Sequence, residues 1–114
     1  MSKQIKTKTI HISDKEGTFS VLFKKKKDKN SELSNLRQIL SNEKAKILHI
    51  CKTKQPESLY KLAKLIGRDF KAVRHDVKIL ERYGFIELIS SYKKGRERLR
   101  PIVDIDQLVI TINI

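Results

Sequence analysis

Residues 58–84 are SLYKLAKLIGRDFKAVRHDVKILERYG, and this stretch decides the fold. Apolar residues recur at helical spacing on both sides of Gly67, which predicts two helices over residues 58–66 and 70–83. Gly67 enters the left-handed conformation at little cost and ends the first helix. Two helices joined by so short a turn form a helix-turn-helix unit.

Each of these predicted helices has a capped start and one apolar face. Ser58 and Asp69 are good N-cap residues, because their side-chain oxygens accept a backbone N–H of the first turn. The apolar faces are Leu59, Leu62, Ala63 and Ile66 in the first helix, and Phe70, Val73, Val77 and Leu80 in the second. We expect these faces to meet in the core, with the small Ala63 where the helices cross.

The opposite face of the second helix is basic. Its residues are Lys71, Arg74, His75, Lys78 and Arg82. Acidic residues are expected at the cap (Asp69) and on the flanks of this face (Asp76 and Glu81). A solvated charged face is the simplest interpretation of such a helix. Its position in a helix-turn-helix favours contact with the major groove of DNA, and we include the neighbouring Arg68 among the contacts.

After Gly84 the apolar spacing changes from helical to strand-like. Residues 86–92 and 97–105 predict two strands, joined by the turn KKGR at 93–96, in which Gly95 can adopt a positive φ. The basic residues of this hairpin are Lys93, Lys94, Arg96, Arg98 and Arg100. Such charges can simply protect an edge strand. Following a helix-turn-helix, they predict a wing whose Lys93, Lys94, Arg96 and Arg98 contact phosphates.

The remaining segments add secondary structure at both ends of the chain. The patterns predict strands over 8–12 and 107–114 and helices over 14–29, 33–40 and 43–52. In the last helix, capped by Ser41 or Asn42, we expect an inward face of Ala45, Ile47, Leu48 and Cys51. The lysine run at the end of the 14–29 segment either satisfies the helix dipole or lies near phosphates, and the sequence leaves both interpretations open.

These elements predict an α+β fold: a winged helix-turn-helix with an added N-terminal strand-helix segment and C-terminal strands. The 114 residues fit one domain. Within it, 1–30 would be the N-terminal extension, 31–85 the helical core, and 86–114 the wing and closing strand.

Composition limits the partners. The net charge is +13 and the pI about 10.0, which favours a polyanion such as nucleic acid, although acidic membranes and proteins also attract basic chains. Cys51 is the only cysteine, and its apolar surroundings predict a buried side chain. The sequence shows no signal peptide and no apolar run long enough to span a bilayer, so we expect a cytoplasmic protein without membrane contact.

The chemistry of an enzyme is missing from the sequence. There is no Gly-rich phosphate loop, no Ser–His–Asp pattern and no pair of carboxylates at catalytic spacing. The three histidines His11, His49 and His75 have no metal-ligand spacing, and one cysteine adds little to them. We therefore expect no catalytic residue, no metal site and no cofactor.

Residues 65–88, LIGRDFKAVRHDVKILERYGFIEL, resemble the core of a family of small winged-helix transcriptional regulators, MarR-like in fold, from archaea and bacteria. The N-terminal strand-helix segment and the closing stretch VDIDQLVITI (103–112) are similar to that family as well. The stretch KKKKDKNS (24–31) is richer in lysine than the family pattern. The resemblance implies DNA binding. Because some members are encoded beside a toxin, it also implies that an antitoxin repressing its own promoter is possible.

The sequence thus predicts sequence-specific binding of double-stranded DNA by a transcriptional regulator, acting as a repressor. The alternatives are an antitoxin that binds a toxin partner, and a binder of structured RNA. We also expect a homodimer, because one recognition helix covers only a few base pairs. The terminal segments 8–12 and 108–114 each have an apolar face, which suits pairing with each other within one chain or across two.

Overall fold

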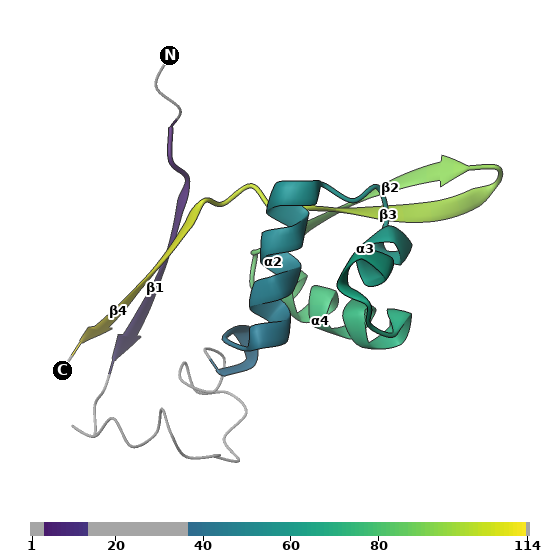
Figure 1. Cartoon of the computed structure of the whole chain (residues 1–114). Coiled ribbons are helices and arrows are strands. Elements are labelled where there is room, and N and C mark those ends of the chain that lie inside the picture. The colour runs from purple at the N-terminus through teal and green to yellow at the C-terminus, as the bar shows by residue number, and fades with distance from the viewer. Residues whose placement is uncertain (1–3, 14–36, 114) are drawn as a thin grey trace. The chain divides into compact units, whose positions relative to one another are not determined.

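The computed structural model describes residues 4–13 and 37–113, and their elements place the protein in the α+β class (Figure 1). The chain divides into two compact units, Ile39–Asp104 and Met1–Gln38 with Ile105–Ile114. The helix expected over 14–29 and the direction of its lysine run lie outside the described residues. Of the segment 33–40, the structure describes a short helical stretch over 37–39.

The unit Ile39–Asp104 contains three helices and a hairpin. Its elements are α2 (Asn42–Lys54), α3 (Leu59–Ile66), α4 (Phe70–Arg82), β2 (Glu87–Lys93) and β3 (Arg96–Ile102). The three helices contact one another, and β3 contacts both α2 and α3. The hairpin formed by β2 and β3 extends beyond the helices as a two-stranded arm (Figure 1).

Each helix begins at a side chain that accepts a backbone N–H from the third residue along. The pairs are Ser41 Oγ with Lys44 N (3.1 Å), Ser58 Oγ with Lys61 N (3.1 Å) and Asp69 Oδ2 with Ala72 N (3.3 Å). α3 ends at Gly67, whose φ of 77° lies in the left-handed region and whose N–H donates to Ala63 O at 2.8 Å. The capped starts and the glycine stop predicted from the sequence are therefore confirmed.

The core of this unit consists of the apolar faces of its helices. All four predicted core residues of α3 are buried, and Val73, Val77 and Leu80 of α4 are 0% exposed. Phe85, which follows α4, is also buried. Two expectations are wrong. Phe70 is only half-buried, because it lies in the first turn of α4 at the margin of the core, and Ala45 is exposed, because it lies about 200° around α2 from the buried Ile47.

The two strands of the hairpin are antiparallel and joined by a two-residue turn. Lys94 and Gly95 have φ angles of 54° and 77°, the pair of positive values that a tight hairpin turn of the type I′ kind requires. Pro101 lies in β3 opposite Leu88 and is buried. A proline has no N–H for a second neighbouring strand, so its position fits a strand that pairs on one side only.

The second unit contains β1 (Thr7–Ser13) and β4 (Gln107–Asn113), which pair in parallel from Thr7↔Gln107 to Ser13↔Asn113. Ile10 is opposite Ile110 in this register. The N–H of Lys6 donates to Asp106 Oδ2 at 3.0 Å just before the first pair of strand residues. The predicted pairing of the two terminal segments is thus present within one chain.

Candidate nucleic-acid interface

The basic face of α4 is accessible along its whole length. Its five residues Lys71, Arg74, His75, Lys78 and Arg82 are all exposed, whereas Val73, Val77 and Leu80 on the opposite side of the same helix are buried. Within the described part of the chain, only Lys78 among these cations has an ion pair, with Glu81 at 3.7 Å. That pair is half exposed and therefore weak. The face thus presents its charges to solvent almost without neutralisation.

Asp76 differs from the expectation that it flanks this face in contact with water. Only 9% of the residue is exposed, and its carboxylate accepts a hydrogen bond from Arg68 Nη1 at 3.0 Å. Lys44 Nζ of α2 lies 3.8 Å from the other carboxylate oxygen. The three side chains connect α2, the turn before α4 and the middle of α4, and we refer to them as the Asp76 ion cluster.

The ion cluster gives Arg68 a structural partner that sequence spacing did not reveal. Asp76 is eight residues further along, in the middle of α4, and Arg68 Nη1 of the turn lies 3.0 Å from its Oδ2. The side chain of Arg68 is 30% exposed, compared with 12% for Lys44, so the guanidinium still reaches solvent. Its predicted contact with DNA remains a prediction.

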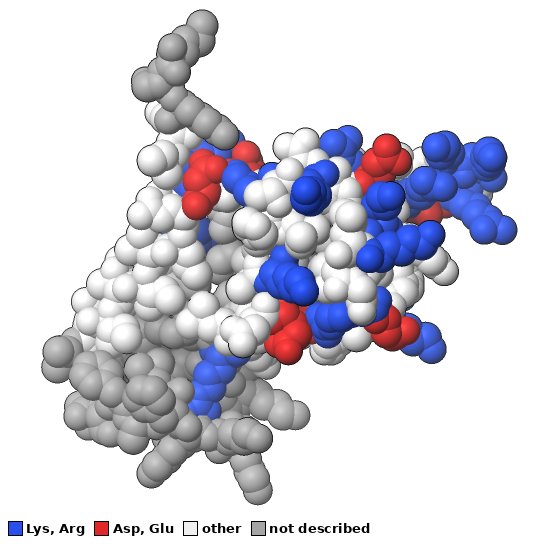
Figure 2. Space-filling view, viewed as in Figure 1, with Lys and Arg blue, Asp and Glu red and all other residues white. Residues whose placement is uncertain are grey.

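The hairpin holds its basic residues at the tip and along one face. In the observed register, Lys93 pairs with Arg96, Ser91 with Arg98 and Ile89 with Arg100, and alternation puts these six residues on one side. All of them are exposed. Figure 2 shows the Lys and Arg side chains crowded at the end of this hairpin.

Glu97 is the one acidic residue of β3, and it belongs to the other side of the hairpin. Its Oε2 accepts hydrogen bonds from Ser90 Oγ at 2.9 Å and from Tyr92 Oη at 3.5 Å. Strand alternation places all three residues on the face opposite the arginines. The hydroxyl groups thus hold the carboxylate away from the basic face.

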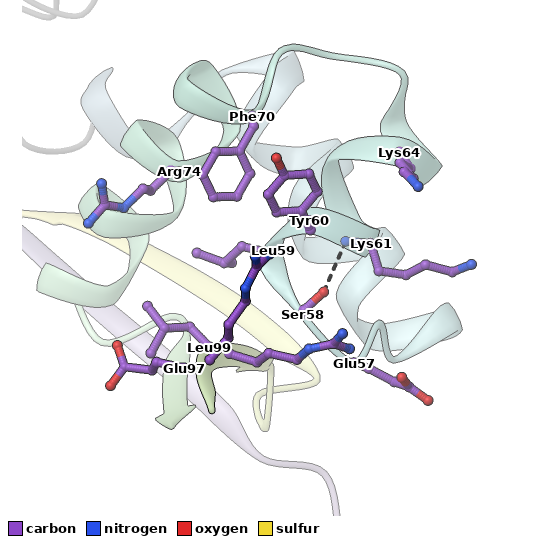
Figure 3. Close-up of a pocket in the computed structure, with 12 residues that line it drawn as sticks. Glu57, Ser58, Leu59, Tyr60, Lys61, Lys64, Phe70, Arg74, Glu97 and Leu99 are labelled. Atoms are coloured by element: carbon purple, nitrogen blue, oxygen red, sulfur yellow. Dashed lines mark hydrogen bonds between the residues drawn. The ribbon is translucent and has the colours of Figure 1, made fainter. Parts of the chain in front are cut away.

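A pocket of about 720 Å³ lies between the start of α3, the start of α4 and β3 (Figure 3). Tyr60 and Phe70 stack in it, with ring centroids 4.6 Å apart and ring planes at 28°. Basic residues from all three elements line the pocket, and they are Lys61, Lys64, Arg74, Arg96 and Arg98. The two acidic residues that line it are Glu57 and Glu97.

Of these lining residues, Arg74, Arg96 and Arg98 are predicted from the sequence as DNA contacts, whereas Tyr60, Lys61 and Lys64 are not. The stack joins residues ten positions apart on two helices, so no periodicity within either helix predicts it. The only available signal was that Tyr60 lies off the apolar stripe of α3, where an aromatic side chain has to be exposed. It is indeed 65% exposed.

The described elements define a small α+β protein with one basic helix face and one basic hairpin. In the described residues, no helix is long and apolar enough to cross a bilayer. The chain belongs to the HVO_A0114 family, which matches it over residues 39–110. The match covers the three helices and the hairpin and extends into β4. No curated protein matches the chain.

Proposed function

We propose that this protein is a winged helix-turn-helix regulator that binds double-stranded DNA, with α4 in the major groove and the tip of the β2–β3 hairpin on the phosphates. The observation that supports the proposal best is the basic face of α4, whose five exposed residues lie opposite the buried Val73, Val77 and Leu80. An α-helix fits the major groove of B-form DNA, which is about 12 Å wide.

The hairpin supports the same interpretation. Its basic face adds cations from a second element that packs on the helices through β3. Phosphate contacts fix the position of a protein on a duplex, and side chains on a helix in the groove discriminate between bases. The basic residues of the hairpin can therefore contact phosphates while those of α4 contact bases. Duplex RNA fits less well, because its major groove is too deep and narrow to admit a helix.

The test begins with selection of a preferred duplex from random DNA, followed by titration of variants. Arg74→Ala is expected to weaken binding to the selected site by about 1–3 kcal/mol, the range for removal of a bidentate base contact. Lys46→Ala, an exposed cation on α2, is the matched control, because it removes the same charge away from both proposed contact elements.

Equal effects of Arg74→Ala and Lys46→Ala would contradict the assignment of α4 to the groove. The same series with duplex RNA of matching sequence tests the alternative polyanion. Binding of RNA as tight as that of DNA would reject the proposal for B-form DNA.

We further propose that the regulator is a homodimer. Within the described residues β1 and β4 pair only with each other, and a two-stranded sheet has open edges on both sides. Ile5 and Val109 in this unit are 68% and 36% exposed. Sedimentation equilibrium at micromolar concentration should give twice the chain mass of 13.3 kDa. A monomer that binds a single half-site with full affinity would reject the dimer.

A further inference from the structure

The stacked pair in the pocket has a ring surface that the protein leaves uncovered. Phe70 is half-buried and supports Tyr60 at 4.6 Å, but Tyr60 itself is 65% exposed. In Figure 3 the two rings lie side by side, with Arg74 beside Phe70, and Glu97 and Leu99 of β3 across the pocket. A second aromatic side chain thus holds Tyr60 in place, and much of its surface remains available to a ligand.

The charges around this ring favour a phosphate-bearing ligand. Five cations and two carboxylates line the pocket, which leaves an excess of three positive charges. The cations come from both sides, Lys61 and Lys64 from α3, and Arg96 and Arg98 from β3. The pocket is open on one side, and its volume of about 720 Å³ falls within the range of about 300–1,000 Å³ for small-molecule sites.

Duplex DNA alone does not match a pocket that combines an exposed aromatic ring with several cations. Paired bases stack on one another and present only their edges in the grooves, so the flat ring of Tyr60 finds no flat partner there. An unpaired base has an open face, and aromatic side chains beside cations are the usual platform for single-stranded nucleic acid. Glu57 and Glu97 add oxygen acceptors for the amino groups of a base.

We propose that the pocket binds one unpaired nucleotide of a single-stranded stretch adjoining the duplex, with its base stacked on Tyr60 and its phosphate facing the pocket cations. The inference rests on the proposed function for the duplex part, because Arg74, Arg96 and Arg98 belong to both surfaces. It extends that function from plain duplexes to junctions between double-stranded and single-stranded DNA.

The experiment compares three DNA molecules with the same duplex and the wild-type chain. One is blunt, one has a short single-stranded tail, and one has a tail of equal length made of abasic nucleotides. Tails are placed on the 5′ and the 3′ strand in turn. The normal tail is expected to tighten binding roughly 5- to 150-fold over the abasic tail, the contribution of one stacked base. Both tails carry the same phosphates, so a purely electrostatic pocket would bind them equally.

Variants then test whether the tighter binding of the normal tail comes from the ring of Tyr60. Tyr60→Leu should abolish the difference between normal and abasic tails, whereas Tyr60→Phe should keep it. Leu65→Ala is the control, an exposed apolar side chain of the same helix that is not among the residues lining the pocket, and it should leave the difference intact.

Two outcomes would overturn the inference while leaving the proposed function standing. One is equal affinity for normal and abasic tails in a wild-type chain that binds the blunt duplex. The other is an equal decrease in affinity for blunt and tailed DNA in Tyr60→Leu, which would make Tyr60 a contact to the duplex backbone. Failure of the proposed function looks different, because the blunt duplex would then show no dependence on Arg74. The comparison of tails needs no variant, so a misfolded mutant cannot decide it.

Discussion

Asp76→Ala should be one of the most destabilising single substitutions outside the apolar core. The carboxylate is buried and bonded to Arg68 at 3.0 Å, and a hydrogen bond to a charged group contributes about 1.5–3 kcal/mol. The pair with Lys44 is longer, 3.8 Å, and adds roughly 0.5–1 kcal/mol. Together these give an expected decrease in the free energy of unfolding of about 2–4 kcal/mol.

The exposure and distance of Arg68 and Lys44 determine how much each variant at these two positions should lower the free energy of unfolding. After Asp76 is removed, Arg68 can regain water because its side chain is 30% exposed, whereas Lys44 at 12% regains less. Arg68→Ala leaves the buried carboxylate with only the distant Lys44 and should cost about 1.5–3 kcal/mol. Lys44→Ala removes the weaker pair and should cost less than about 1 kcal/mol.

Urea denaturation followed by far-UV circular dichroism measures these differences in the free energy of unfolding. A decrease of about 1 kcal/mol lowers the Tm by roughly 4–8 °C in a domain of this size, so the order should also appear in thermal melts. The double variant of Asp76 and Arg68 completes a thermodynamic cycle, and its coupling energy should reach about 1–3 kcal/mol.

The reasoning would be refuted if Asp76→Ala cost less than about 0.5 kcal/mol, or if the coupling energy were near zero. The cycle also separates the two roles of Arg68. If this side chain contacts phosphate, Arg68→Ala should lower the slope of log affinity against log salt by about one unit. If it only supports α4, the salt slope should not change.

Three further outcomes are expected. Replacing Lys93 and Lys94 with Ala should weaken binding to all duplex sequences alike and reduce the salt slope by about one for each phosphate that the hairpin no longer reaches, which a titration over salt concentration measures. Gln55→Gly should stabilise the fold by about 0.5–1 kcal/mol in urea denaturation, because Gln55 has a φ of 48° at the end of α2, where a side chain is unfavourable. Burial raises the pKa of the Cys51 thiol from 9.0 to about 12. This folded pKa lies above the unfolded one, so the contribution of the protonated thiol is complete below about pH 9 and is lost as the pH rises toward 12. In parallel urea titrations, Cys51→Ala should therefore lose less stability across that range than the wild type.

Local patterns predicted most of the unit Ile39–Asp104. The starts of α2, α3 and α4 follow from Ser41, Ser58 and Asp69, because capping depends on residues within one turn. Strand periodicity and a lysine-glycine turn likewise predicted the β2–β3 hairpin, whose backbone geometry depends on two adjacent residues. These features were predictable because the contacts that determine them join residues a few positions apart within one helix or one turn.

The sequence failed where the deciding contact joins separate elements. Asp76 was expected on a solvated flank, and it is buried because Arg68 and Lys44 approach it from the turn and from α2. Phe70 was expected in the core, but it is half-buried at the margin of the core and stacks on Tyr60 of α3. The partners of Asp76 and Phe70 lie outside α4, so the periodicity of that helix does not predict them. They become apparent only when the elements pack on one another.

Three acidic residues near the proposed interface, Asp69, Asp76 and Glu97, each have a hydrogen-bond partner within the protein. Asp69 accepts the Ala72 N–H at the start of α4, where the helix dipole favours a negative charge. Asp76 lies on the buried side of the same helix. Glu97 accepts hydrogen bonds from two hydroxyl groups on the face of the hairpin opposite its arginines.

This arrangement has an electrostatic consequence. Asp76 is the buried member of the three, and a carboxylate exposed at its position would cancel part of the positive potential of α4 that attracts a polyanion. With Asp76 buried and paired, the basic face of α4 keeps a positive potential that extends about 10 Å at roughly 0.1 M salt, the screening length at that ionic strength. The double variant Ser90→Ala with Tyr92→Phe releases the Glu97 carboxylate from both hydroxyl groups and changes no basic side chain, so it should slow association with DNA.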